Sequence, residues 1–275
     1  MFFIFLFIFF ILNPYLSFAY EVFSISVPDN YGLTGKEKVF YIGAGEPAFG
    51  LIYDLKPPEK VFLLSPNGTF NKLTLLREEF IDKALNTKRI GYKIKIIPKI
   101  KGDYYICIES DYTLTRDGIL NKFLVKTPFH VGIEKGWDNS CGFDLEIKPY
   151  TRPYGFRKNG IFWGQVFYKN KPLENGTVEA ERFSPVFLRL EDLPKDSYGE
   201  INYPYLKKTV KITKNGFFIM SLEEPGWWVL TVKVKNGKKF YANNIYPVEL
   251  IHHFWIYVFG YKKEIPIYEY FPIPK

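Results

Sequence analysis

The chain has 275 residues, of which 47% are hydrophobic and 19% aromatic, and this content excludes an intrinsically disordered protein. Its formal net charge of +8 raises the question of nucleic-acid binding, because clustered lysines and arginines neutralise phosphates. The lysines are instead spread singly through segments such as YKIKIIPKIK, where alternation places them on a solvated face. We therefore expect no nucleic-acid partner.

Residues 1–19 form an apolar run that ends in Ser17-Phe18-Ala19, a pattern typical of a secretory signal peptide. Asn13-Pro14 interrupts the run before it reaches the roughly 20 apolar residues of a membrane-spanning helix. We expect cleavage after Ala19 and export, to the periplasm or an equivalent space, with no membrane span in the mature protein. The alternative is an uncleaved membrane anchor.

Short apolar segments with turn-rich spacers follow over residues 20–135. They read EVFSISVP, KVFYIGAG, KVFLLSPNG, KLTLLRE, YKIKIIPK, DYYICIES and KFLVKT. Strands at this spacing predict a β-sandwich, and Arg77 to Lys88 is the one segment that predicts a helix. We expect Tyr104 or Tyr105 to form a tyrosine corner, as in immunoglobulin-like sandwiches.

The chain contains two cysteines, Cys107 on a predicted strand and Cys141 beyond it. An exported protein meets an oxidising environment, in which disulfides persist. A disulfide would pin the segment around Cys141 to the first domain; two isolated thiols are the alternative. The spacing matches neither a CxxC pair nor a zinc site.

Residues 136–160 are predicted to connect this domain to a second one. Pro149 and Pro153 cannot donate hydrogen bonds to a sheet, so an extended strap fits KPYTRPYGF better than a central strand does. Arg152 is expected to anchor the strap across the domain junction. An anion-binding loop is the alternative.

Residues 161–260 predict a second β-sandwich, with hairpin turns at Asn215-Gly216 and Asn236-Gly237. Trp227 and Trp228 are expected to fill its core, and the longer loop between Phe183 and Leu206 is a place where function often lies. The fold class is therefore all-β, with two sandwich domains in tandem. A Pro- and aromatic-rich tail, residues 261–275, is expected either to pack on its own domain or to dock a partner.

Four motifs occur in a fixed order: Trp137-Asp138, RPYG at 152–155, GQV at 164–166 and PGWW at 225–228. Over residues 136–230 the chain thereby resembles an exported family of uncharacterised domains that are described as periplasmic components of nickel and cobalt uptake. The resemblance implies an immunoglobulin-like or transthyretin-like second domain and a membrane metal-uptake transporter as partner. It implies structural or interdomain roles for Trp137, Asp138, Arg152, Tyr154, Trp227 and Trp228.

Proteins of that family commonly begin their mature chain with a histidine, where this sequence has Tyr20, a poor nickel ligand because its phenol stays protonated. The candidate ligands for a nickel or cobalt ion are therefore His130 and His253. His252 and His253 are adjacent on a predicted strand and should point to opposite faces, with His252 on the core side. A structural role is the alternative for each histidine.

The sequence has no Gly-x-Ser-x-Gly elbow and no His-Glu-x-x-His pair, so we expect a protein that is not an enzyme. The first hypothesis is an exported accessory protein of nickel or cobalt uptake, which binds the metal or docks a transporter. The second is an envelope structural or protein-interaction module with no metal role. Carbohydrate binding through exposed aromatic side chains is a third hypothesis.

Overall fold

The computed structural model describes residues 20–184, 186–201 and 206–260. The predicted signal peptide and the predicted tail lie outside the described residues. Within the described part the chain forms strands throughout, with two short 3-10 helices, η1 (Pro47–Phe49) and η2 (Leu190–Asp192). The predicted all-β, sandwich-like class is confirmed. A search of the same residues for a helix with the length and apolar character to cross a membrane finds none.

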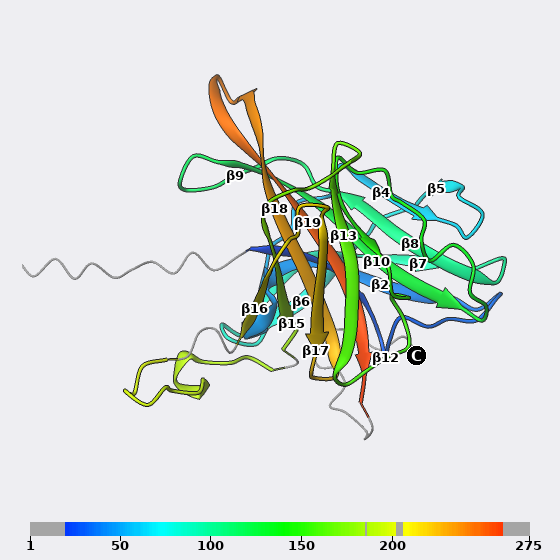
Figure 1. Ribbon diagram of the computed structural model, residues 1–275, viewed down its shortest axis with the longest axis horizontal. Helices are drawn as coiled ribbons and strands as arrows, with labels where there is room; N and C mark the ends of the chain where they lie inside the picture. The colour runs from blue at the N-terminus through cyan, green and yellow to red at the C-terminus, as the bar shows by residue number, and fades with distance from the viewer. Residues whose placement is uncertain (1–19, 185, 202–205, 261–275) are drawn as a thin grey trace, which may run out of the picture.

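The strands form three sheets, which we name A, B and C (Figure 1). Sheet A holds five strands from the first third of the chain: β1 (Glu21–Ser26), β2 (Lys38–Glu46), β3 (Leu51–Tyr53), β6 (Leu76–Asp82) and β7 (Thr87–Ile96). Sheet C holds four strands from the second half: β11 (Leu145–Pro149), β13 (Gly160–Tyr168), β14 (Lys171–Pro172) and β17 (Phe217–Leu222).

Sheet B has ten strands and draws on both halves of the chain. Its main path runs β16-β15-β18-β19-β10-β8-β4-β5, with β12 beside β19 and β9 beside β10. The bounds are β4 (Lys60–Leu64), β5 (Phe70–Lys72), β8 (Gly102–Glu109), β9 (Thr113–Leu114), β10 (Leu120–Val131), β12 (Phe156–Arg157), β15 (Thr177–Arg182), β16 (Lys207–Lys211), β18 (Gly226–Tyr241) and β19 (Asn244–Phe259).

Sheet B lies between the other two and contributes to a core on each of its faces. Phe80 of sheet A packs in one core with Trp255 of sheet B. Phe162 of sheet C packs in the other core with Phe254 of sheet B. Successive side chains of a strand point to opposite faces, so β19 supplies Trp255 to one core and Phe254 to the other. This double burial explains the continuous apolar run from Phe254 to Phe259 in β19.

Strands from both sides of the predicted domain boundary share sheet B. β10 and β19 pair in parallel, from Leu120 opposite Val248 to Lys126 opposite Phe254. β10 belongs to the predicted first domain and β19 to the predicted second one. The domain bounds stay a prediction, and what the structure shows is a central sheet common to both halves.

The edge strand β1 is fastened to sheet B through side chains. The indole of Trp255 donates a hydrogen bond to the carbonyl oxygen of Val22 at 3.1 Å, and the indole of Trp227 donates to that of Ser26 at 3.0 Å. These bonds satisfy carbonyl groups that the edge of a sheet would otherwise leave unpaired. The start of the described chain is thus held against its last two strands.

The predicted helix from Arg77 to Lys88 was wrong, because this segment forms the hairpin of β6 and β7. Phe80 is fully buried, and Asp82 accepts a hydrogen bond from the amide of Ala84 at 3.0 Å and so shapes the turn. Burial of Phe80 in the core between sheets A and B outweighs the weak helix propensity of the surrounding polar residues.

The hairpin turn predicted at Asn236-Gly237 was also wrong. β18 continues past it with a shift of register between Lys235 and Lys238, and Gly237 has a φ of 72°. Such a shift marks a β-bulge, in which glycine readily adopts positive φ. The chain turns at Ala242-Asn243, so the hairpin is longer than expected. A turn does form at Asn215-Gly216, but it is not a hairpin turn, because β16 pairs with β15 in sheet B and β17 pairs with β13 in sheet C.

Two aromatic pairs divide their members between the two cores. The hydroxyl of Tyr104 donates to the carbonyl oxygen of Ile100 at 2.7 Å, four residues upstream, which is the bond of a tyrosine corner. Tyr105 lies in the core between sheets B and C. Trp227 packs between sheets A and B, and Trp228 between sheets B and C. The two tryptophans therefore fill both cores rather than one.

Candidate functional site

His130 and Asp103 are cross-strand partners on β10 and β8. Nδ1 of His130 lies 2.6 Å from one carboxylate oxygen of Asp103, and the other oxygen accepts a hydrogen bond from the amide of Lys135 at 2.9 Å. Asp103 is only 2% exposed. A carboxylate in this position fixes the orientation of an imidazole and makes it more basic as a metal ligand.

Aromatic rings enclose His130. The ring of Tyr154 stacks on it at 4.0 Å, and the ring of Tyr31 meets it edge-on at 5.1 Å. Burial, together with the charge of Asp103, raises the pKa of Tyr154, so its phenol stays protonated. The His130 side chain keeps 11% of its surface exposed, and its one hydrogen bond within the described part of the chain uses Nδ1. Nε2 is therefore the ring nitrogen that could hold a metal ion.

His253 lies elsewhere and is fully buried on β19. Its Nδ1 is 3.0 Å from the hydroxyl oxygen of Thr231, which in turn donates to Glu21 at 3.2 Å. Burial lowers the pKa of His253 well below its usual value. Val125 is the partner of His253 on β10, so His130 lies five positions further along, at about 17 Å. The structure does not bring the two predicted metal ligands together.

His252 points to the opposite face of sheet B. Its ring contacts Phe143, which belongs to the core between sheets B and C, whereas the ring of His253 stacks on Phe123 of the other core. The opposite orientations are as predicted, but both faces are core. Burial lowers the pKa of His252 to about 3. Neither of its ring nitrogens has a hydrogen-bond partner in the described structure.

Tyr20 is the first residue that the structure describes. Its ring packs at 5.3 Å from that of Phe123. Burial, followed by the charge of Asp54, raises the pKa of Tyr20 to about 12, so the phenol is neutral and a weak metal ligand. Among residues 20–184, 186–201 and 206–260, no group of three or more His, Cys, Asp or Glu side chains could hold a metal ion.

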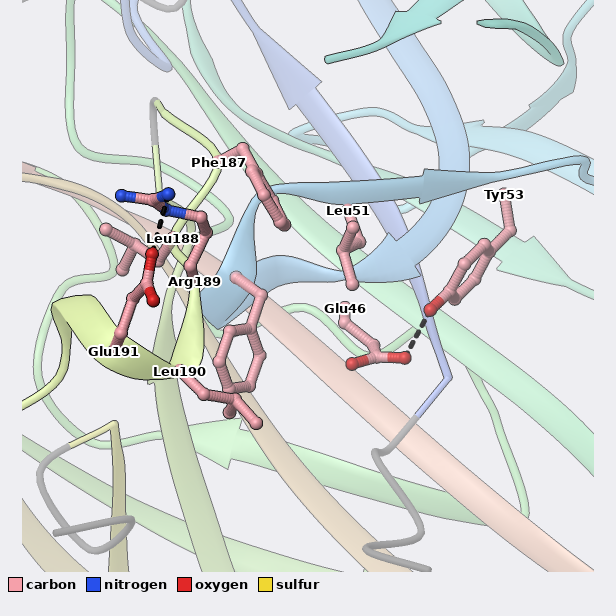
Figure 2. A pocket seen from close by; sticks show the side chains of 9 residues that line it. Glu46, Leu51, Tyr53, Phe187, Leu188, Arg189, Leu190 and Glu191 are labelled. Atoms are coloured by element: carbon pink, nitrogen blue, oxygen red, sulfur yellow. Dashed lines mark hydrogen bonds and ion pairs between the residues drawn. The ribbon is translucent and has the colours of Figure 1, made fainter. Parts of the chain in front are cut away.

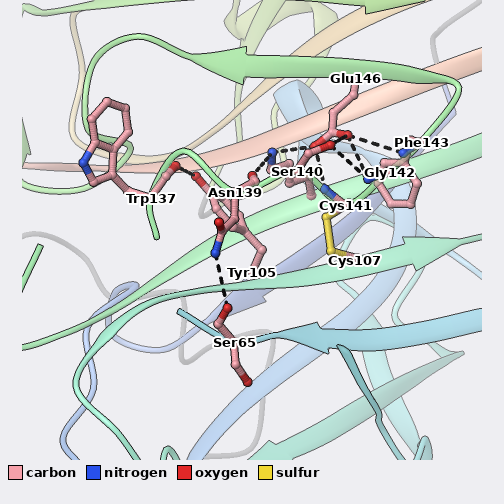
Figure 3. The surroundings of a disulfide bond; sticks show 11 residues. Ser65, Tyr105, Cys107, Trp137, Asn139, Ser140, Cys141, Gly142, Phe143 and Glu146 are labelled. Atoms are coloured by element: carbon pink, nitrogen blue, oxygen red, sulfur yellow. Dashed lines mark hydrogen bonds and ion pairs between the residues drawn. A yellow bond between two sulfur atoms is a disulfide. The ribbon is translucent and has the colours of Figure 1, made fainter. Parts of the chain in front are cut away.

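Cys107 and Cys141 are joined by a disulfide (Figure 3). Cys107 lies on β8 of sheet B, and Cys141 precedes β11, the first strand of sheet C. The bond therefore ties the connector to the central sheet. The connector is not only an extended strap, because it contains two paired strands, β11 beside β13 and β12 beside β19.

Glu146 occupies a nest beside this disulfide. Its carboxylate accepts hydrogen bonds from Ser140 Oγ at 2.6 Å and from the amide of Cys141 at 2.8 Å. It also meets the fully buried ammonium of Lys126 at 2.6 Å. Burial alone would raise the pKa of Glu146, but Lys126 and these hydrogen bonds hold it below its usual value. Neither residue belongs to a recognisable motif, so no pattern in the sequence pointed to this pair.

The remaining residues predicted as structural lie around the same connector. The carbonyl of Trp137 accepts a hydrogen bond from Tyr105, while Asp138 is exposed. Arg152 forms an ion pair with Glu134, but both side chains are more than half exposed. Exposed pairs contribute little to stability. Arg152 is therefore a weaker anchor than the sequence suggested.

Residues 186–201, which belong to the loop between Phe183 and Leu206, pack beside η1 and β3 and leave a pocket of about 580 Å³ (Figure 2). Phe49 and Leu188 are among its apolar walls. Glu46 lines one side and accepts a hydrogen bond from Tyr53, and burial raises the pKa of this carboxyl. The length of the loop was the only sequence signal for this pocket.

A family model described as "Domain of unknown function (DUF4198)" matches residues 19–236. The chain belongs to this family. The match covers sheet A, most of sheet B and all of sheet C, and it ends within β18. A comparison with curated proteins gives no match. Membership of DUF4198 is thus consistent with the resemblance found in the sequence and leaves a role in metal uptake as a proposal.

Solved structures with similarity to this DUF4198 member are distant. A Salmonella alpha-2-macroglobulin mutant is 13% identical with a TM-score of 0.27, over 86% of this chain and 15% of that one. Native Escherichia coli alpha-2-macroglobulin is 10% identical with a TM-score of 0.22, over 88% and 14%. A marsupial T cell receptor is 10% identical with a TM-score of 0.22, over 84% and 95%. The chain spans about one seventh of the macroglobulins that it matches.

Proposed function

We propose that this DUF4198 member is an exported, non-enzymatic accessory protein that presents His130 to a nickel or cobalt ion on its way to a membrane transporter. The observation that supports the proposal is the Asp103–His130 pair, in which Asp103 engages Nδ1 at 2.6 Å. This arrangement leaves Nε2 for an incoming ion, and imidazole is a favoured ligand of nickel and cobalt.

His130 supplies one ligand in this proposal, and the other positions around the ion belong to water or to the partner. Such a site binds weakly and releases its ion readily, which suits delivery better than storage. His253 does not fit this role, because it is fully buried with Nδ1 beside Thr231.

Proton NMR of the imidazole rings tests the proposal directly, because the chain has three histidines. Paramagnetic nickel added to the protein should broaden the ring signals of His130 and leave those of His252 and His253 sharp. His130→Ala should abolish the calorimetric heat of nickel binding. Asp103→Asn should weaken binding about 10-fold or more, because it removes the carboxylate that orients the ring.

His252→Leu is the matched control, since it removes an imidazole that faces a core. It should leave nickel binding unchanged. Retention of full nickel affinity by His130→Ala, with no selective broadening of its signals in the parent protein, would refute the metal role.

An interaction module is the second candidate, and the outer face of sheet C favours it. Trp163 and Tyr150 are 40% and 42% exposed, and their rings lie 5.1 Å apart. Ile161 and Ile219 are exposed on the same face by 61% and 60%. Trp163→Ala should remove protein partners captured from envelope extracts if this face docks a protein. An unchanged set of partners would count against this candidate.

A further inference from the structure

The hairpin of β18 and β19 extends as an arm beyond the rest of the fold (Figure 1). Each strand has sixteen residues, and the arm, which we define as residues 235–247, comprises the tip and the bulge at Gly237. Strands in globular proteins usually hold about 3–10 residues, so this hairpin is unusually long. It continues past the rest of sheet B and carries exposed side chains at its end.

One face of the arm bears an exposed apolar pair. Phe240 and Ile245 are cross-strand partners and are 68% and 62% exposed. The other face bears Tyr241 and Tyr246, which are partly buried and pack against the core between sheets B and C. The arm is therefore fixed to the protein by its inner face, while its outer face presents apolar side chains to solvent.

The arm is also strongly basic. Lys235, Lys238 and Lys239 are all exposed, and its sequence KNGKKFYANNIYP contains no acidic residue. Lys238 lies two positions before Phe240 on the same strand and so shares its face. Lys239 is held over the ring of Tyr112 at 4.8 Å. Cations and large apolar side chains thus occur together on this protruding arm.

We propose that this arm docks the protein on the surface of an anionic lipid membrane. Phe240 and Ile245 enter the boundary between headgroups and acyl chains, and the lysines meet the lipid phosphates, as in other interfacial anchors. A nucleic acid would use the lysines but would gain nothing from Ile245. The proposal needs no metal ion and is independent of the function proposed above.

Labelling at a single site tests insertion. Both cysteines of the chain are in the disulfide, so Ala242→Cys at the exposed turn provides one reactive thiol for an environment-sensitive dye. The dye should shift to the blue with vesicles that contain phosphatidylglycerol, and not with pure phosphatidylcholine. Ile161→Cys, on an equally exposed position of sheet C, should give no shift. Because the readout is local, it is insensitive to membrane binding by residues 1–19.

Two sets of variants of the full chain separate the apolar and charged contributions to arm insertion. Phe240→Ser with Ile245→Ser should weaken the vesicle affinity reported by the dye at position 242 at least 10-fold, whereas Ile161→Ser with Ile219→Ser should leave it unchanged. Each of Lys235→Gln and Lys238→Gln should weaken it about fivefold, and high salt should act in the same direction. Lys239→Gln should have a smaller effect, because Lys239 is the cross-strand partner of Tyr246 and lies on the inner face of the arm. All these positions are exposed, so the melting temperature should not change. Equal insertion into neutral vesicles, or a dye at position 242 that stays in water, would overturn the proposal.

Discussion

Lys126 and Glu146 hold their charged atoms 2.6 Å apart at a point closed to solvent, with 0% and 6% of their side chains exposed. The ammonium also donates to the carbonyl oxygen of Asn139 at 2.8 Å and lies over the ring of Tyr105 at 4.4 Å. The pair therefore links β10 of the central sheet to β11 of sheet C and to the loop that precedes it.

Lys126→Met should destabilise the protein by about 3–5 kcal/mol, because it leaves the carboxylate of Glu146 buried without its counter-charge. Urea unfolding at neutral pH measures the change. Arg152→Ala is the matched control, since it breaks an exposed ion pair and should cost less than about 1 kcal/mol. Equal losses in the two variants would show that burial does not set the strength of these pairs.

Removal of the disulfide should have a comparable effect. Cys107 and Cys141 are 34 positions apart. A crosslink of this span lowers the conformational entropy of the unfolded chain and so stabilises the folded protein by about 3–4 kcal/mol. Cys107→Ala with Cys141→Ala should therefore lower the melting temperature by about 10 °C. A reductant should reproduce the loss in the parent protein. The reductant should not change the melting temperature of the double variant. A decrease in that variant would show that the reductant acts on something other than the disulfide.

His252 should make the protein sensitive to mild acid. Burial lowers its pKa to about 3 in the folded state, below the unfolded value near 6.5. Below pH 6.5 His252 is protonated in the unfolded chain but stays neutral in the folded protein. The free energy of unfolding therefore falls as the pH falls. His252 should account for a loss of about 2 kcal/mol between pH 7 and pH 5. The loss of stability over this interval should be smaller by that amount in His252→Leu. Urea unfolding at each pH measures it, and parallel curves of stability against pH for the variant and the parent would contradict the prediction.

Gly91 leaves no space for a side chain. A Cβ atom at this position would lie 2.1 Å from the ring of Phe80. Gly91→Ala should therefore cost about 1–3 kcal/mol through overpacking. The cost should shrink when Phe80 is replaced by Leu, because the smaller side chain relieves the clash. A double-mutant cycle by urea unfolding measures this coupling, and additive losses would count against it.

Local patterns predicted the local structure well. The period of two identified most strands and the all-β class. The turn at Asn215-Gly216 and the tyrosine corner at Tyr104 were predicted because both depend on neighbouring residues, but the turn joins two different sheets and not the strands of a hairpin. Asn236-Gly237 misled for the same reason. The dipeptide accepts positive φ in a turn or in a bulge, and only the packing of Tyr241 and Tyr246 on the core decides between them.

The candidate sites depended on contacts that no local pattern encodes. His130 was identified by its residue type, but Asp103, 27 positions earlier, gives it an orientation that the sequence did not predict. Lys126 belongs to no motif in the sequence, although it pairs with Glu146 inside the fold. Which strands become neighbours in a sheet decides both outcomes, and strand periodicity carries no information on pairing partners.

The parallel pairing of β10 with β19 has a consequence for how the protein is made. Leu120 leaves the ribosome 128 residues before its partner Val248, which corresponds to about 6–26 s of synthesis. During that interval one long edge of β10 has no neighbour, and Phe123 and Val125 cannot complete their core. The nascent chain must therefore stay unaggregated until β19 arrives. Early binding by a holding chaperone would shield this edge and keep the unfinished chain competent to fold.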